Sequence, residues 1–329
     1  MRVVFFQRKP REHGNFSLEF IFEDVRSRFP SSMKPVVAIS KYESNGVWKR
    51  VYNAVEASFR QGDVNHVTGD VNFLANYLSK NRTILTILDC VAMTNSAGFK
   101  RWFYQKFFLD MPVRRAKYVT VISNATKQEV LKYVDYPEER IVIVPVAVSE
   151  RYYPAPKKIN VDKPRLLHVG LAPNKNLDRL IEAIQGMPCH LDIVGKLNEE
   201  QKEKLAQHEI EYSYAFNISD EDMVQQYVDC DILTFVSTYE GFGMPIVEAN
   251  AVGRPVLTSN LSSMPEVAGS AACLVDPFDV TSIRNGLLKI INNEEYRNNL
   301  IARGFENCKR FDAQQIAEMY FDLYRKVGD

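Results

Sequence analysis

A series of short apolar runs, hydrophobic almost throughout and separated by helical stretches, constrains the fold of this chain more than any other feature. In the first 150 residues the runs occupy six segments: 3–6, 35–39, 64–69, 83–88, 118–123 and 141–146. Strands of a sheet with one exposed face alternate apolar and polar residues, whereas continuously apolar strands are buried on both faces, as in parallel sheets covered by helices. The pattern predicts a doubly wound α/β domain over residues 1–150.

The same pattern resumes after an interruption that is rich in proline. Residues 149–165, SERYYPAPKKINVDKPR, have little apolar periodicity, so we interpret 151–164 as a linker. Five further apolar runs follow, at 165–170, 190–195, 232–237, 255–260 and 272–276. They predict a second doubly wound domain over 165–311. A last helix over 312–326, with Asp312 as its N-cap, is expected to pack back on the first domain.

Two doubly wound domains in tandem indicate where ligands bind. In open α/β sheets the ligand lies outside the carboxyl ends of the strands. We therefore expect the carboxyl edges of the two sheets to face one another across a cleft, and we seek functional residues in the loops at these edges.

The composition excludes several classes of protein. No apolar run approaches the roughly 18 residues of a membrane span, and the four apolar residues after Arg2 are too few for a signal-peptide core. Five scattered cysteines indicate neither a disulfide framework nor a zinc site, which fits a reducing cytoplasm. Residues 1–150 hold 22 Lys and Arg against 15 Asp and Glu, and the remainder holds 19 against 26. The basic half suits an anionic ligand or membrane surface, or an attraction to the acidic half; no nucleic-acid partner is expected.

The segment 237–256, STYEGFGMPIVEANAVGRPV, is the most informative one for function. A strand is expected to end near Ser237, and Pro245 suits the first position of a helix that follows. Glycines at 241 and 243 let the backbone approach a ligand, and the helix amino terminus favours an anion such as phosphate. Glu240 and Glu248 would repel phosphate, so we expect them to bind flanking sugar and ribose hydroxyls. The alternative is an ordinary helix start followed by an exposed glutamate.

This segment resembles the signature of the retaining glycosyltransferases of the GT-B fold, family 4, also called glycosyl transferases group 1. Segments 168–184 and 265–277 are similar to the same family, and the resemblance is strong over 118–310. It implies two Rossmann-like domains, the first binding the acceptor and the second a nucleotide sugar. It further implies that Glu240 contacts donor-sugar hydroxyls, that Glu248 contacts the ribose, and that the backbone of Gly241, Phe242 and Gly243 lines the sugar and phosphate site.

The loop after the first strand of the second domain is assigned to the donor by the same resemblance. It carries Gly170, Asn174 and Lys175, and the lysine would neutralise charge on the departing diphosphate. The family has an arginine in this loop where this chain has Leu171. We regard Arg8, Lys9 and Arg11 as cations that could compensate.

The first domain departs from the family in a second place. Leu88 replaces a histidine, but Asp89 remains and would orient the acceptor hydroxyl or accept its proton, unless it only caps a turn. His66 lines the acceptor side of the cleft or is packed in the core. Gly14 stands where relatives have a glycine pair that approaches the sugar or phosphate.

Two further segments call for an interpretation. The sequence DCD at 229–231 is not read as a metal motif, because it closes a helix and opens a buried strand; no metal or cofactor is expected. Residues 98–118 interleave aromatics with cations, and five fall on one helical face: Phe99, Trp102, Phe103, Lys106 and Phe107. Such a face lies on a membrane surface or packs a helix on a sheet.

The predicted function is that of a cytoplasmic, metal-independent, retaining hexosyltransferase, peripheral on the inner membrane. It would move a sugar from a nucleotide diphosphate to a hydroxyl of a glycan or lipid-linked glycan in the synthesis of a cell-surface polysaccharide. The alternatives are a nucleotide-sugar epimerase or phosphorylase on the same fold, a catalytically silent nucleotide-sugar binder, and a secreted two-lobed solute-binding protein. The nucleobase, sugar, acceptor, linkage and oligomeric state are left open.

Overall fold

The chain forms two compact units, each built on one parallel six-stranded sheet. The computed structural model describes residues 1–9, 17–68, 71–94 and 98–328. The first unit comprises Met1–Ala147 and Ala313–Asp329, and the second comprises Val148–Asp312. Every strand pairing in both sheets is parallel. The predicted α/β class is confirmed, because the continuously apolar runs are the buried strands of these sheets.

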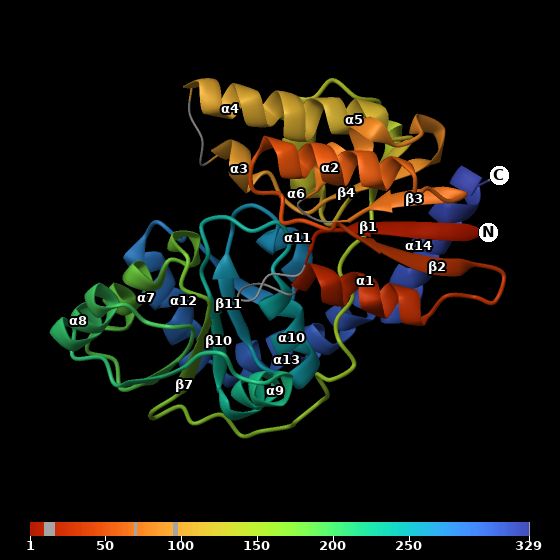
Figure 1. Cartoon of the computed structure of the whole chain (residues 1–329). Helices are drawn as coiled ribbons and strands as arrows, with labels where there is room; N and C mark the ends of the chain where they lie inside the picture. Colours follow the sequence, from red (N-terminus) through yellow and green to blue (C-terminus); the bar gives the residue numbers. More distant parts are fainter. Residues whose placement is uncertain (10–16, 69–70, 95–97, 329) are drawn as a thin grey trace. The chain divides into compact units, whose positions relative to one another are not determined.

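The first sheet has the strand order β2-β1-β3-β4-β5-β6 (Figure 1). Its strands are β1 (Arg2–Gln7), β2 (Lys34–Ile39), β3 (Val64–Val67), β4 (Thr83–Ile87), β5 (Tyr118–Val121) and β6 (Ile141–Ile143). The helices of this unit are α1 (Ser17–Ser27), α2 (Val47–Ser58), η1 (Asn72–Tyr77), η2 (Lys80–Arg82), α3 (Val91–Thr94), α4 (Gly98–Tyr104), the π-helical η3 (Gln105–Asp110), α5 (Met111–Arg115), α6 (Asn124–Tyr133), η4 (Glu138–Arg140) and α14 (Ala313–Gly328).

Both faces of this sheet are covered. On β1, Val4 and Phe6 belong to an apolar cluster with residues of α2, η1 and α6, whereas Val3 and Phe5 belong to one with residues of α1 and α14. Figure 1 shows α2 on one face of this sheet and α1 and α14 on the other. Successive side chains of a strand point to opposite faces, so burial on both requires apolar residues at every position. The last helix therefore belongs to the first unit, although the chain reaches it from the second.

The second sheet has the order β12-β11-β10-β7-β8-β9. Its strands are β7 (Arg165–Val169), β8 (His190–Val194), β9 (Tyr212–Ala215), β10 (Ile232–Phe235), β11 (Val256–Ser259) and β12 (Ala272–Val275). The helices are η5 (Pro173–Lys175), α7 (Leu177–Ile184), α8 (Glu199–Gln207), α9 (Asp220–Asp229), α10 (Met244–Val252), α11 (Met264–Ala268), α12 (Val280–Asn292), α13 (Glu294–Cys308) and η6 (Lys309–Phe311).

Strand β9 is absent from the strands predicted from the sequence. It pairs only with β8, at the edge of the sheet, and none of its four residues is fully buried. An edge strand that is partly exposed does not need a continuous apolar run. A search for continuous apolar runs, which identified the other strands, therefore does not detect β9.

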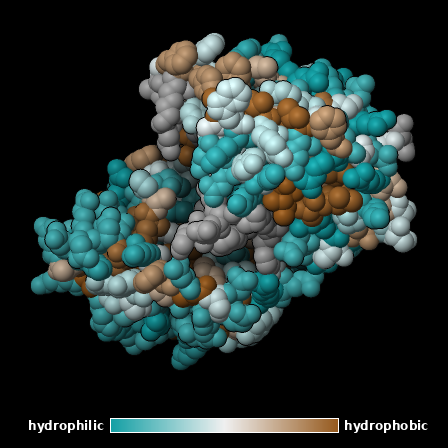
Figure 2. All heavy atoms as spheres, viewed as in Figure 1, coloured by the Kyte–Doolittle hydropathy of each residue, from teal (hydrophilic) through white to brown (hydrophobic). Residues whose placement is uncertain are grey.

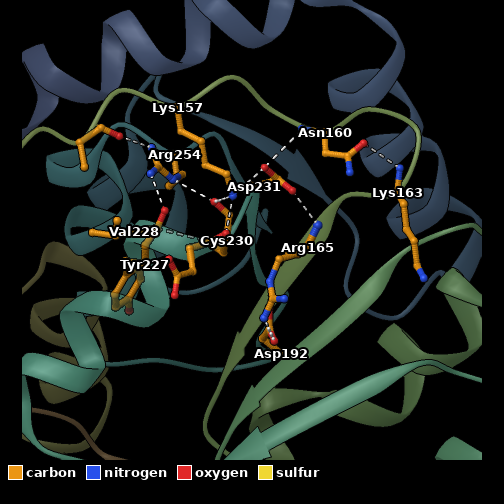
Figure 3. A network of polar contacts seen from close by, with 12 residues as sticks. Lys157, Asn160, Lys163, Arg165, Asp192, Tyr227, Val228, Cys230, Asp231 and Arg254 are labelled. Carbon is orange, nitrogen blue, oxygen red and sulfur yellow. Dashed lines mark hydrogen bonds and ion pairs between the residues drawn. The ribbon is translucent and has the colours of Figure 1, made fainter.

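Residues 151–164, predicted as a linker, have no helix or strand and are bonded to the second unit (Figure 3). The buried Asp231 carboxylate accepts from the backbone N–H of Arg165 at 2.8 Å and pairs with Lys157 at 3.0 Å. The buried Arg254 guanidinium donates to the carbonyls of Ala155 and Cys230, both at 2.9 Å. Asp231 therefore fixes the chain at the amino end of β10.

None of the helices in the described part of the chain combines the length and the hydropathy that crossing a membrane requires.

Candidate active site

The loop after β7 is shaped by a glycine and a lysine. Gly170 has φ 90°, and a Cβ built on it would lie 3.0 Å from Cε of Lys175, so the glycine is needed both for the turn and for the approach of the lysine. Lys175 ends the short helix η5, and its Nζ lies 4.7 Å from the centre of the Phe235 ring. The lysine is thus held over the end of β10, the strand next to β7.

Lys175 and Glu240 form the central contact of the site. Nζ of Lys175 donates to Oε1 of Glu240 at 2.7 Å, and the side chains are only 20% and 15% exposed. Asn174 donates from Nδ2 to the Tyr239 carbonyl at 2.9 Å and contacts Oε1 of Glu240 at 3.5 Å. The two sequence segments predicted to bind one donor are therefore joined at the carboxyl edge of the second sheet.

The turn between Glu240 and α10 is fixed by two serines. Ser262 Oγ donates to the Glu240 carbonyl at 2.6 Å, and Ser263 Oγ donates to the Phe242 carbonyl at 2.6 Å. Gly243 has φ 115° and starts α10, whose amino end is capped by no side chain of the described residues. The Phe242 ring is buried against Phe311, so only its backbone is left to face a ligand.

Glu248 lies one turn into α10 and is held by two tyrosines. Tyr227 OH donates to its Oε2 at 2.5 Å, and Tyr152 is a second hydroxyl partner. The Tyr152 and Tyr227 rings stand edge to face, with centres 5.3 Å apart. Burial raises the pKa of the Glu248 carboxyl, and the two hydroxyls and the charge of Lys175 act against this rise. Neither tyrosine belongs to a sequence motif, so neither was predicted as a site residue.

Two other residues of the second unit were not singled out. Asn176, in the left-handed conformation, donates to the carbonyls of Val236 and Pro277 at 3.0 and 2.7 Å and so ties three loops together. His168 of β7 is buried, and burial together with the positive charge of Lys175 lowers its pKa to about 4. A neutral imidazole therefore lies near the lysine.

Leu171, which replaces the family's arginine, packs against the apolar core of the second unit. A Cβ built on Gly195 would lie 2.6 Å from Cδ1 of Leu171, so this side chain fills the space beside that glycine. The position serves packing, and Lys175 is the cation that the loop offers.

In the first unit the predicted acceptor-side residues have different environments. His66 is fully buried: its ring nitrogens bond to Tyr324 OH at 2.9 Å and to Thr86 Oγ1 at 2.7 Å. The acceptor-side alternative for His66 is wrong, and the alternative of packing in the core holds, because β3 directs the side chain inward. Asp89 is exposed after β4 and accepts from the Val91 N–H at 3.0 Å. This contact is the one expected if Asp89 caps a turn. Arg8 and Lys9 directly follow β1, and Arg11 and Gly14 lie outside the described residues.

No cluster of three or more His, Cys, Asp or Glu side chains suited to a metal ion occurs among residues 1–9, 17–68, 71–94 and 98–328.

Comparison with known proteins bears on the same residues. The model of the family "Glycosyl transferases group 1" matches residues 150–307. O-antigen chain mannosyltransferase B of Escherichia coli is 29% identical over 248 residues, 68% of this chain and 64% of that protein. A serotype-specific mannosyltransferase WbdA of Escherichia coli is 25% identical over 275 residues, 75% of this chain and 34% of that protein. The chain thus spans less than two thirds of either relative.

Among solved structures, HepE of Anabaena, crystallised with UDP and glucose, superposes with a TM-score of 0.81. The match covers 98% of this chain and 99% of HepE at 16% sequence identity, so it concerns the fold. The predicted GT-B fold and the resemblance read from residues 237–256 are confirmed.

Proposed function

Because this chain belongs to the group 1 glycosyltransferases, we propose that it transfers a sugar from a nucleotide diphosphate donor to a hydroxyl of a glycan or lipid-linked glycan. The observation that carries the proposal is the contact between Lys175 and Glu240 at 2.7 Å, beside the amino end of α10. A cation and a helix amino end suit the diphosphate, and a carboxylate suits the sugar hydroxyls.

In this proposal each residue of the site has one role. Lys175 and the amino end of α10 hold the diphosphate and stabilise the charge that develops on it as the sugar–phosphate bond breaks. Glu240 accepts from hydroxyls of the sugar, and Glu248 from hydroxyls of the ribose. The acceptor oxygen attacks from the face that the diphosphate leaves, its proton passes to a phosphate oxygen, and the configuration is retained. Asp89 would orient the acceptor hydroxyl.

The sugar we propose is mannose. Both curated relatives described above are mannosyltransferases, one of them of the O-antigen chain, which also supports a polysaccharide or its lipid-linked precursor as the acceptor. The enzyme would need no metal or cofactor, because Lys175 and α10 supply the positive charge. We place it in the cytoplasm, at the inner face of the membrane where lipid-linked acceptors are made.

The experiment is an assay for nucleotide diphosphate release from GDP-mannose and from UDP-, ADP- and dTDP-hexoses, with and without glycan acceptors. We expect acceptor-dependent release that chelator leaves unchanged, and an α-linked product from an α-linked donor. Glu240→Ala should lower kcat/KM by at least about 100-fold, because it removes a contact to the reacting sugar. Glu211→Ala is the matched control: Glu211 also pairs with a lysine, Lys163, at 2.6 Å, but is exposed.

Three outcomes would contradict the proposal. A free sugar epimer without transfer would indicate an epimerase, and a sugar phosphate formed from phosphate and glycan would indicate a phosphorylase. Binding of nucleotide sugars without turnover on any acceptor would indicate a silent binder.

A further inference from the structure

Helix α2 turns its large apolar side chains outward. Trp48 and Phe59, at and just beyond its ends, are each 85% exposed, and Val47 is 71% exposed. Val51, Tyr52 and Val55 between them are also exposed. At 100° per residue these six side chains lie within an arc of about 140°. We name them the α2 apolar row.

The opposite side of α2 is small or polar. Its buried residues are Asn53, Ala54 and Ala57, and the two alanines pack in the core of the first unit. A surface helix ordinarily has the reverse arrangement, with large apolar residues inward. The α2 apolar row therefore contributes little to folding, and a contiguous exposed patch of this kind marks an interaction surface.

Two exposed lysines, Lys41 and Lys49, border this row. Lys41 lies against Tyr52, with Nζ 5.3 Å from the ring centre, and Lys49 is exposed. Glu56 of the same helix is paired with Arg60 at 3.2 Å. The surface is thus apolar with a basic border, and it belongs to the half of the sequence that carries an excess of Lys and Arg.

A second apolar and basic segment lies beside α2. The Arg50 guanidinium of α2 stacks on Phe108 of η3, 4.7 Å from the ring centre. On α4, Phe99 is 77% and Trp102 is 54% exposed, with their rings stacked at 5.5 Å. Figure 2 shows hydrophobic and hydrophilic atoms intermixed over the upper part of this face, where α2 and α4 lie in Figure 1. The two helices extend one surface, of which α2 carries the longer apolar row.

We propose that the α2 apolar row docks the protein on an anionic phospholipid surface. This proposal rests on the proposed function, because such a surface would give the enzyme access to a lipid-linked acceptor. Interfacial helices combine Trp, Phe and aliphatic residues with flanking Lys and Arg, which anionic headgroups attract. A second copy of the chain fits less well, because a two-fold contact on this row would bring Lys41 and Lys49 toward their own copies.

The test is flotation of the full chain with vesicles of phosphatidylglycerol and phosphatidylethanolamine, compared with phosphatidylcholine alone. We expect binding to the anionic vesicles that 1 M salt weakens. Trp48→Ser combined with Phe59→Ser should reduce binding by about tenfold or more, because two large side chains no longer leave water. Met319→Ser, an apolar residue exposed on α14, is the matched control and should bind like the parent. Both variants should unfold at the parent temperature.

The two proposals fail separately. The docking surface would be overturned if the parent and the double variant bound vesicles equally, or if the parent did not bind them. It would also be overturned if the parent formed a dimer that the double variant lost, while neither protein bound vesicles. Binding of nucleotide sugars is measured on the same samples without vesicles, and the double variant should retain it. If the parent floats with vesicles but binds no nucleotide sugar, the docking surface is supported and the proposed function is contradicted.

Discussion

Two ion pairs of the second unit have similar lengths in different surroundings. Lys175 and Glu240 are separated by 2.7 Å and are 20% and 15% exposed, whereas Lys163 and Glu211 are separated by 2.6 Å and are more than half exposed. An exposed pair contributes little, because water solvates both charges and salt screens them. The shielded pair holds both groups in place before a ligand arrives, which is the preorganisation that electrostatic catalysis requires.

The two tyrosines beside Glu248 favour its ionised form. Burial raises the pKa of this carboxyl, and the hydroxyls of Tyr152 and Tyr227 together with Lys175 oppose that rise. Because donor hydroxyls need an ionised Glu248, donor affinity should fall on the acid side as this carboxyl takes up a proton. Tyr152→Phe and Tyr227→Phe each remove a bond to the ionised form, so each should move the fall in affinity to higher pH. Calorimetry across pH 4.5–8 measures this.

Tyr136→Phe serves as the control for the tyrosine variants. This hydroxyl donates to the Ala116 carbonyl at 3.1 Å within the first unit, whereas Glu248 belongs to the second unit. The donor affinity of Tyr136→Phe should fall at the same pH as that of the parent. A fall at the parent pH in both Tyr152→Phe and Tyr227→Phe would show that the hydroxyls do not tune the carboxylate.

At the element scale, the turn between β7 and η5 depends on Gly170. Gly170→Ala strains a residue at φ 90° and drives a methyl group against Lys175, so we expect both lower stability, by about 1–2 kcal/mol, and weaker donor binding. Gly186→Ala is the matched control, since Gly186 has φ 71° but nothing within 4 Å of its built Cβ. Thermal unfolding and calorimetry should show two destabilised variants, of which only Gly170→Ala binds donor poorly. Equal donor affinity in both would disprove the steric role.

Helix α14 is tied to β3 by one buried hydrogen bond. Tyr324 OH lies 2.9 Å from Nδ1 of His66, among apolar and aromatic side chains. Tyr324→Phe leaves a ring nitrogen without this partner and should destabilise the first unit by about 1–3 kcal/mol. Urea unfolding measures this, with Tyr133→Phe as the control, because the Tyr133 hydroxyl accepts from Arg101 at 3.4 Å in an exposed contact. Unchanged stability of Tyr324→Phe would mean that the bond adds nothing to the packing.

Over the whole molecule, the sequence predicts features that lie in one continuous segment, such as apolar strands and motifs. It does not predict contacts between residues that are distant in the sequence. Eleven strands were predicted because each is an apolar run, and β9 was missed because an edge strand is half exposed. The motif at 237–256 identified Glu240 and the glycines, since these positions need particular residue types. Tyr152 reaches Glu248 from a distant segment that carries no motif, and only the fold brings them together. The two alternatives for His66 could not be separated from the sequence for the same reason, because its partner Tyr324 lies in the last helix.

We propose that Lys175 and Glu240 form a donor site for a nucleotide sugar. The most direct test is a calorimetric titration of the parent, Lys175→Ala and Lys163→Ala with GDP-mannose and the other nucleotide hexoses. We predict that at least one donor binds the parent and Lys163→Ala equally, and binds Lys175→Ala about 10- to 100-fold more weakly, as the loss of a charge-assisted contact requires. Equal affinity of all three proteins for every nucleotide sugar, or no affinity in the parent, would contradict the claim.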